Sequence, residues 1–269
     1  MESAKLNFNM NGHQNIIVMR HGDRADYCEP LWVTTAERPW DPPLVHYGKV
    51  RAFQTGQRIR SQVGFPIHRV FVSPFLRCIQ TAAEVVAALS AVDHNATFSN
   101  DMPSIDNSKL KVAIEYGLCE KLKTMSEVAP KDGKIDFKIS DLEAMFPEGT
   151  VDHNVEMVYK ELQQWEESRE AFKDRYVHTL KVLASKHPSE NLLIISHWGG
   201  VSATLYKYFK DATKYFIDYC SCIELRTQIT NNDDGSGSSV EFEVVNSHGI
   251  SYTENNVSIH DHVISHPSV

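Results

Sequence analysis

The sequence predicts an α/β protein, a three-layer sandwich in which helices cover both faces of a mostly parallel central sheet. Two observations support this fold class. Short apolar runs alternate along the chain with longer segments of helical periodicity, and charged residues gather directly after several of the runs. A chain of 269 residues can bury one sizeable core, so we expect a single domain spanning residues 1–269.

Four short apolar runs are expected to form buried, parallel strands. They are Asn15–Met19, Arg69–Val72, Lys111–Ile114 and Asn191–Ile195. Two later segments, 221–227 and 240–245, are joined by a turn-rich stretch and predict a terminal antiparallel pair.

Helical periodicity fills most of the intervals between these runs. One helix is expected over 44–63, and a second follows Ser73 and Pro74, where Ser73 would supply the cap. The interval 152–186 has a long helical pattern that we expect to break into two helices, and another helix should reach about residue 209.

Three segments lack a sustained period. Residues 23–43 should form a long irregular loop, of the kind that often borders a site. Residues 116–150 are expected to form a lid-like insertion, and a polar tail over about 250–269 should be loosely ordered. This tail contains three candidate metal ligands, His260, His262 and His266. We expect their side chains to be solvated and to form no metal site.

Composition bounds the partners. A net charge of −8 and a pI near 5.9 argue against nucleic acid and against an anionic membrane surface. The five cysteines are odd in number and lack metal-ligand spacing, which favours a reducing compartment. We therefore expect a soluble cytoplasmic protein, with the nucleus as an alternative and a homodimer left open.

Cationic and imidazole side chains follow the predicted strands. His21 and His197 come just after the first and fourth strands, with Arg20 and Arg24 beside His21. Arg77 lies at the start of the helix after the second strand. Because ligands bind beyond the carboxyl ends of parallel strands, these side chains should converge. Guanidinium groups and a helix N-terminus are typical ligands of a phosphate dianion.

Three motifs in this order resemble the histidine phosphatase superfamily, also called phosphoglycerate mutase-like. They are Arg20-His21-Gly22, the segment from Ser73 to Ala82, and Ser196-His197. The run from Arg20 to Asp26 is most similar to the branch of ecdysteroid-phosphate phosphatases and suppressor-of-T-cell-receptor-signalling phosphatases. The segment 145–152 resembles plant phosphoglycerate mutase-like proteins.

This resemblance implies a role for each residue. His21 would be the nucleophile, since nearby arginines keep an imidazole neutral and its lone pair free. Arg20, Arg77 and His197 would bind the phosphoryl oxygens, and Arg24 would be the extra phosphate ligand of this branch. Glu120 would be the general acid, and neither a metal nor another cofactor is required.

The general acid and the function stay open at this level. Glu115, Asp23 and Glu148 are alternatives to Glu120. A phosphatase acting through a phosphohistidine is the first hypothesis; a phosphoglycerate mutase and a catalytically weak phosphate-binding regulatory module are the others.

The substrate also stays open. Phosphotyrosine, small phosphorylated metabolites and hydrophobic alcohol phosphates are comparable candidates. Tyr27, Trp32 and Trp40 could accept an aromatic leaving group or pack against the lid, and Trp198 could narrow the pocket or point outward.

Overall fold

A seven-stranded mixed sheet forms the centre of the computed structural model, which describes residues 13–29, 31–93, 95–99, 103–208, 212–231, 238–254 and 260–261. The strands lie in the order β3-β2-β4-β1-β5-β6-β7. Their bounds are β1 (Asn15–Arg20), β2 (Arg69–Val72), β3 (Lys111–Ile114), β4 (Leu192–Ser196), β5 (Ala212–Asn231), β6 (Ser238–Glu254) and β7 (His260–Asp261). The first four strands of this order are parallel to one another, and the last three continue the sheet in antiparallel fashion.

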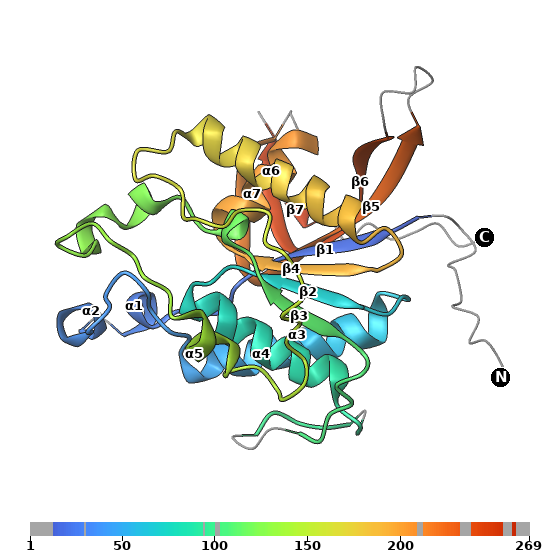
Figure 1. Cartoon of the computed structure of the whole chain (residues 1–269), viewed down its shortest axis with the longest axis horizontal. Helices are drawn as coiled ribbons and strands as arrows, with labels where there is room; N and C mark the ends of the chain where they lie inside the picture. Colours follow the sequence, from blue (N-terminus) through green and yellow to red (C-terminus); the bar gives the residue numbers. More distant parts are fainter. Residues whose placement is uncertain are drawn as a thin grey trace.

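Two layers of helices enclose the sheet, as Figure 1 shows. The helices α3 (His46–Gln62) and α4 (Leu76–Ser90) cover one face, and α6 (Arg169–Lys186) and α7 (Trp198–Tyr208) cover the other. Alternate residues of each strand serve the two faces: Ile17 and Met19 belong to the cluster on the α4 side, and Ile16 and Val18 to the cluster on the α6 side. The predicted three-layer α/β sandwich is confirmed.

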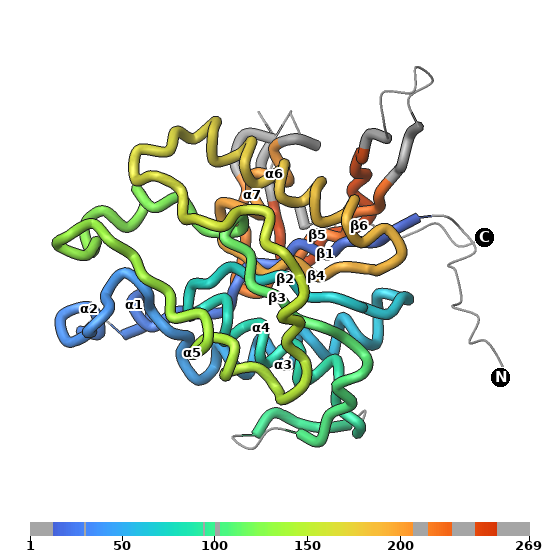
Figure 2. Tube along the Cα trace, viewed as in Figure 1, coloured from blue at the N-terminus to red at the C-terminus, as the bar shows by residue number. Residues whose placement is uncertain are grey.

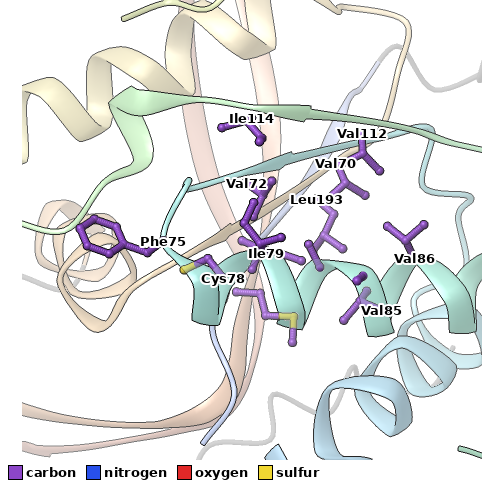
Figure 3. Close-up of a cluster of buried hydrophobic side chains, with 14 of the residues drawn as sticks. Val70, Val72, Phe75, Cys78, Ile79, Val85, Val86, Val112, Ile114 and Leu193 are labelled. Carbon is purple, nitrogen blue, oxygen red and sulfur yellow. The ribbon is translucent and has the colours of Figure 1, made fainter. Parts of the chain in front are cut away.

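The helix α4 packs against the sheet, and one of its ends lies beside the carboxyl ends of the strands. In Figure 3, Ile79 and Val86 of this helix lie beneath Val72 and Leu193 of the sheet. Phe75 and Cys78 occupy the end of the helix that lies at the carboxyl ends of the strands.

The helix α4 begins differently from the prediction. Ser73 was expected to cap it, but the N-cap residue is Phe75, and its side chain makes no capping hydrogen bond. The backbone N–H of Leu76 instead donates to Oδ1 of Asp41 at 2.8 Å. The carboxylate of Asp41, which lies in the early loop 23–43, thus caps the helix. The side chain of Ser73 is free for another role.

The antiparallel pair at the end of the chain is longer than predicted. β5 and β6 pair over most of their 20 and 17 residues, and β5 lies directly beside β1. Figure 2 shows β1, from the first part of the chain, beside β5, from the last part. β6 includes residues 250–254, and His260–Asp261 form β7; His262 and His266 lie outside the described residues.

The two-helix prediction for 152–186 is wrong in its first half. Residues 152–168 contain no helix, and α6 begins at Arg169 after the cap Ser168. The reason is that apolar residues of this stretch serve both layers: Val155 packs on the α6 side, and Leu162 and Trp165 pack on the α4 side. A helix with one buried stripe cannot reach two faces of a sheet.

The segment 116–150 is irregular and packed on the core. It holds two 3₁₀ helices, η1 (Tyr116–Leu118) and η2 (Leu122–Val128), and the short helix α5 (Ile139–Glu143). Met125, Phe137 and Phe146 are buried in the cluster on the α4 side. The early loop carries two further short helices, α1 (Ala25–Cys28) and α2 (Trp32–Thr35). None of the helices among the described residues has the length and apolar character needed to cross a bilayer.

Candidate active site

Two histidines meet where β1 and β4 end. These strands are parallel neighbours, so the residues after them, His21 and His197, come together at one edge of the sheet. Their ring centroids are 5.5 Å apart, with the ring planes at 69°. The convergence predicted from the strand ends is therefore present in the structure.

His21 is held with one ring nitrogen available. Its backbone N–H donates to the carbonyl of Ser196 at 2.9 Å, and its ring Nδ1 lies 2.8 Å from the carbonyl oxygen of Gly22. A carbonyl only accepts, so the proton is on Nδ1 and the lone pair on Nε2. Burial lowers the pKa of His21 well below its usual value, and the charges of Arg77 and Arg20 lower it further. The ring is neutral at pH 7, as a nucleophile must be.

His197 is fixed through both ring nitrogens. Nη2 of Arg77 donates to Nδ1 at 3.1 Å, which places the ring proton on Nε2, where the Oγ of Ser73 accepts it at 2.8 Å. The ring is 1% exposed, and burial, followed by the charge of Arg77, lowers the pKa of His197 well below its usual value.

Arg77 is a buried cation with unused donors. It is 1% exposed, and its Nε and Nη1 have no hydrogen-bond partner among the described residues. Nη1 lies 4.0 Å from Oδ1 of Asp41, beyond hydrogen-bonding distance. Buried guanidinium donors are costly to leave unpaired, so this geometry indicates a site for an anion.

Arg20 offers a second unused donor. Its Nη1 donates to the carbonyl of Ile217 at 2.5 Å, and its Cζ lies 4.0 Å from the ring centroid of Tyr219. Its buried Nε has no hydrogen-bond partner in the described part of the chain. Two strand residues of β5 thus hold Arg20 while leaving an N–H edge open.

Arg24 is near the site but paired. It donates from Nε and Nη2 to the carboxylate of Asp26, at 2.6 and 2.5 Å. Its charge still acts on both histidines, where it contributes to lowering the pKa of His21 and of His197. Arg24 therefore adds positive potential to the site, and its side chain would have to leave Asp26 to bind a phosphate directly.

Of the candidate acids, Glu120 is the one placed at the cationic cluster. Its Oε2 accepts from the backbone N–H of Gly199 at 3.4 Å, close after His197. Burial lowers the pKa of both Arg20 and Arg77, and the charge of Glu120 acts on each guanidinium in the opposite direction.

Glu115 has a different environment. Its two carboxylate oxygens accept three backbone hydrogen bonds, from Gly117 at 2.7 Å, Val158 at 2.6 Å and Tyr159 at 3.0 Å. The side chain is 1% exposed. Glu115 thus anchors the irregular stretch after Asp152 to the end of β3, and its oxygens are occupied.

The other two candidates are occupied or distant. Asp23 forms an ion pair with Arg51 at 2.8 Å. Glu148 is exposed, and the residue after it, Gly149, accepts a hydrogen bond from Lys111 at the amino end of β3. The site lies at the carboxyl ends of the strands, so Glu148 is at the opposite edge of the sheet.

The aromatic residues of the early loop divide between core and surface. Trp40 is buried and packs edge-to-face on Phe75 and on Phe137 of the 116–150 segment. Tyr27 is 75% exposed and Trp198 is 45% exposed. Trp40 is therefore a core residue, while Tyr27 is available to a ligand.

Sequence reasoning missed three residues of the site. Ser73 was expected to cap a helix, and Asp41 lies in the loop 23–43, which has no sustained period. Tyr219 gave no signal, because it lies in a strand whose pairing to β1 brings it to His21, with ring centroids 5.8 Å apart. Only the pairing of β5 with β1 in the folded structure brings Tyr219 to the site.

A comparison with protein families finds a match in the first part of the chain. The model of the histidine phosphatase superfamily, branch 1, matches residues 16–99, the segment that carries Arg20, His21, Arg24 and Arg77. The expected resemblance to this superfamily is thus confirmed over that segment. Among curated proteins, none matches the chain.

Solved structures add the fold. The ecdysone phosphate phosphatase of Bombix mori, in complex with tungstate, is 20% identical, with a TM-score of 0.54 over 91% of this chain and 96% of that one. This likeness shows a common fold. The phosphoglycerate mutase of Bacillus anthracis is 18% identical, with a TM-score of 0.47 over 86% of this chain and 92% of that one.

Proposed function

We propose that this chain hydrolyses phosphate monoesters through a phosphohistidine on His21, without a metal ion. The observation that carries the proposal is the set of unpaired donors around His21: the buried Nε and Nη1 of Arg77 and the buried Nε of Arg20. These groups fit a phosphoryl dianion, and they supply the positive charge that a metal ion would otherwise provide.

The first half of the reaction would use His21 and Glu120. The lone pair on Nε2 of His21 attacks phosphorus, and the bond from phosphorus to the leaving oxygen breaks. The carboxyl group of Glu120 gives its proton to that oxygen, so the product alcohol leaves neutral.

The second half would reverse the roles. The Glu120 carboxylate takes a proton from a water molecule, whose oxygen attacks phosphorus, and the nitrogen–phosphorus bond breaks. Inorganic phosphate leaves, and His21 is again neutral. Arg20, Arg77 and the charge of Arg24 would hold the phosphoryl oxygens through both steps.

His197 would change partner when phosphate arrives. In the structure its Nδ1 is an acceptor for Arg77. A phosphoryl oxygen also accepts, so binding it requires a proton on Nδ1. Because the hydroxyl of Ser73 can donate as well as accept, it can support this other tautomer by donating to Nε2. The pair Ser73 and His197 thus permits binding without charging the ring.

The experiment is hydrolysis of 4-nitrophenyl phosphate in excess EDTA, with acid-labile phosphate on the protein measured after rapid quenching of a radiolabelled substrate. The wild type should turn over and carry label, and His21→Ala should lose both by at least ~10³-fold. His153→Ala, an exposed histidine in the 152–168 stretch, is the matched control and should be unaffected.

Each other outcome points elsewhere. Activity in His21→Ala contradicts the proposed nucleophile, and loss of wild-type activity in EDTA indicates a metal-dependent hydrolase. Transfer between phosphoglycerates that outpaces hydrolysis favours the mutase hypothesis. Tungstate binding without turnover favours the regulatory module.

A further inference from the structure

β5 is irregular where it passes the end of β1. The register of β5 against β6 shifts between Ile217 and Cys222, and Cys220 has a φ of 57°, in the left-handed region that non-glycine residues seldom adopt. The N–H of Cys220 donates to the carbonyl of His21 at 3.2 Å. Backbone strain of this kind is kept where neighbouring contacts enforce it, often at functional sites.

This irregular segment holds Arg20 from two directions. The carbonyl of Ile217 accepts from its Nη1, and the ring of Tyr219 lies against the guanidinium with 4.0 Å from Cζ to the ring centroid. Both contacts come from β5, while Arg20 itself ends β1. The same segment also touches the backbone of His21, so it fixes two site residues together.

An aromatic ring and a carboxylate affect the guanidinium group they contact in different ways. A carboxylate binds the N–H groups of a guanidinium and neutralises its charge, as Asp26 does for Arg24. An aromatic face attracts the cation through its quadrupole and uses none of the N–H groups. Arg20 therefore keeps its charge and the free donor that a phosphate needs.

We propose that Tyr219 is a positioning residue for the phosphate site, and that its ring holds the Arg20 guanidinium with its free N–H edge toward the phosphoryl group. This inference rests on the proposed function. It assigns the effect to the aromatic face and not to the phenol hydroxyl. Burial raises the pKa of Tyr219, so the phenol stays neutral at pH 7.

The test compares Tyr219→Phe, which keeps the aromatic face, with Tyr219→Leu, which keeps apolar bulk without it. The readouts are inhibition by tungstate, KM and kcat for 4-nitrophenyl phosphate, and the thermal midpoint. Tyr219→Leu should weaken tungstate binding and raise KM by about 5- to 30-fold, with a smaller effect on kcat, and Tyr219→Phe should stay within about two-fold of wild type. Phe216→Leu, an exposed aromatic on the same strand, is the control and should match the wild type.

Two results would overturn this inference. One is tungstate binding by Tyr219→Leu equal to that of the wild type; the other is an equal loss in Tyr219→Phe and Tyr219→Leu, which would assign the role to the hydroxyl. If Tyr219→Leu does not fold, Tyr219→Met carries the same expectation. A wild type that neither binds tungstate nor hydrolyses the ester removes the proposed function itself, so the two failures are distinct.

Discussion

Nη2 of Arg77 donates a hydrogen bond of 3.1 Å to Nδ1 of His197. The guanidinium and the imidazole are thus hydrogen-bonded to each other, and a phosphoryl group bound as proposed would take the place of one partner. Both side chains are 1% exposed, so their arrangement is set by the packing around them and not by solvent. The site is preorganised, and substitutions within it should affect catalysis more than folding.

Ser73→Ala should lower kcat/KM by about ten-fold, because the alternative tautomer of His197 would lose its donor. Ser73→Thr, which keeps the hydroxyl, should restore most of the activity. Steady-state kinetics at pH 7 measure both variants. Wild-type kinetics in Ser73→Ala, or a loss confined to Ser73→Thr, would contradict the role of the hydroxyl.

Arg77→Lys should reduce kcat/KM by about 10²- to 10³-fold while keeping the positive charge. A lysine cannot give the paired N–H geometry of a guanidinium, and its shorter reach leaves Nδ1 of His197 without a donor. Arg169→Lys, at the exposed start of α6, is the control. Near-normal kinetics in Arg77→Lys would mean that charge alone suffices.

Glu120→Gln should slow an alkyl phosphate by about 10²- to 10⁴-fold and 4-nitrophenyl phosphate by much less, because a good leaving group needs no proton. Glu115→Gln should act differently. It replaces an oxygen that accepts a backbone hydrogen bond, so it should lower the thermal midpoint and not alter the ratio between the two substrates. A leaving-group dependence in Glu115→Gln and none in Glu120→Gln would exchange their roles.

Stability should fall as the pH drops below about 6.5. His21 and His197 stay neutral in the folded protein because their pKa values lie well below the usual one, whereas the unfolded chain takes up protons near pH 6.5. Each histidine then contributes a slope of about 1.4 kcal/mol per pH unit until its folded-state pKa is reached. Denaturant unfolding from pH 7.5 to 5 should show a reduced slope in His21→Gln. A wild-type stability that rises on acidification over this range would contradict the assignment.

Alanine substitutions at Gly199 and Gly200 should have different main effects, on activity and on stability respectively. A Cβ at Gly199 would meet Oε1 of Glu120, the end of a flexible side chain, and Cζ of Phe172 at 3.0 Å, so Gly199→Ala should displace the proposed acid and lower kcat with a smaller loss of thermal midpoint than Gly200→Ala. A Cβ at Gly200 would overlap the ring of Tyr176, which is fully buried, so Gly200→Ala should destabilise the fold by several kcal/mol. Melting curves beside kinetics separate the two effects.

The sheet and most of the site were predictable from the sequence because their signals are local. Buried parallel strands appear as continuous apolar runs, and β2 and β3 begin and end where those runs do. His21 and His197 follow such strands, so parallel pairing alone brings them together.

The parts that could not be predicted depend on tertiary contacts. Residues 152–168 have helical spacing, yet their apolar side chains reach two different layers. The choice between Glu120 and Glu115 as the candidate acid depends on which backbone N–H groups surround each carboxylate. Tyr219 reaches Arg20 only through the irregular backbone of β5, which no local pattern announces.

The place of β1 in the sheet has a consequence for how the protein is made. β1 ends at Arg20, whereas its two neighbours in the sheet, β4 and β5, begin at Leu192 and Ala212. During translation β1 therefore has neither of its hydrogen-bonding neighbours in the sheet until the segment that begins at Leu192 has been made. The candidate site is complete only once β5 has been made, and a chain cut short before residue 212 would leave one edge of β1 open and Arg20 without the carbonyl and the ring that hold it.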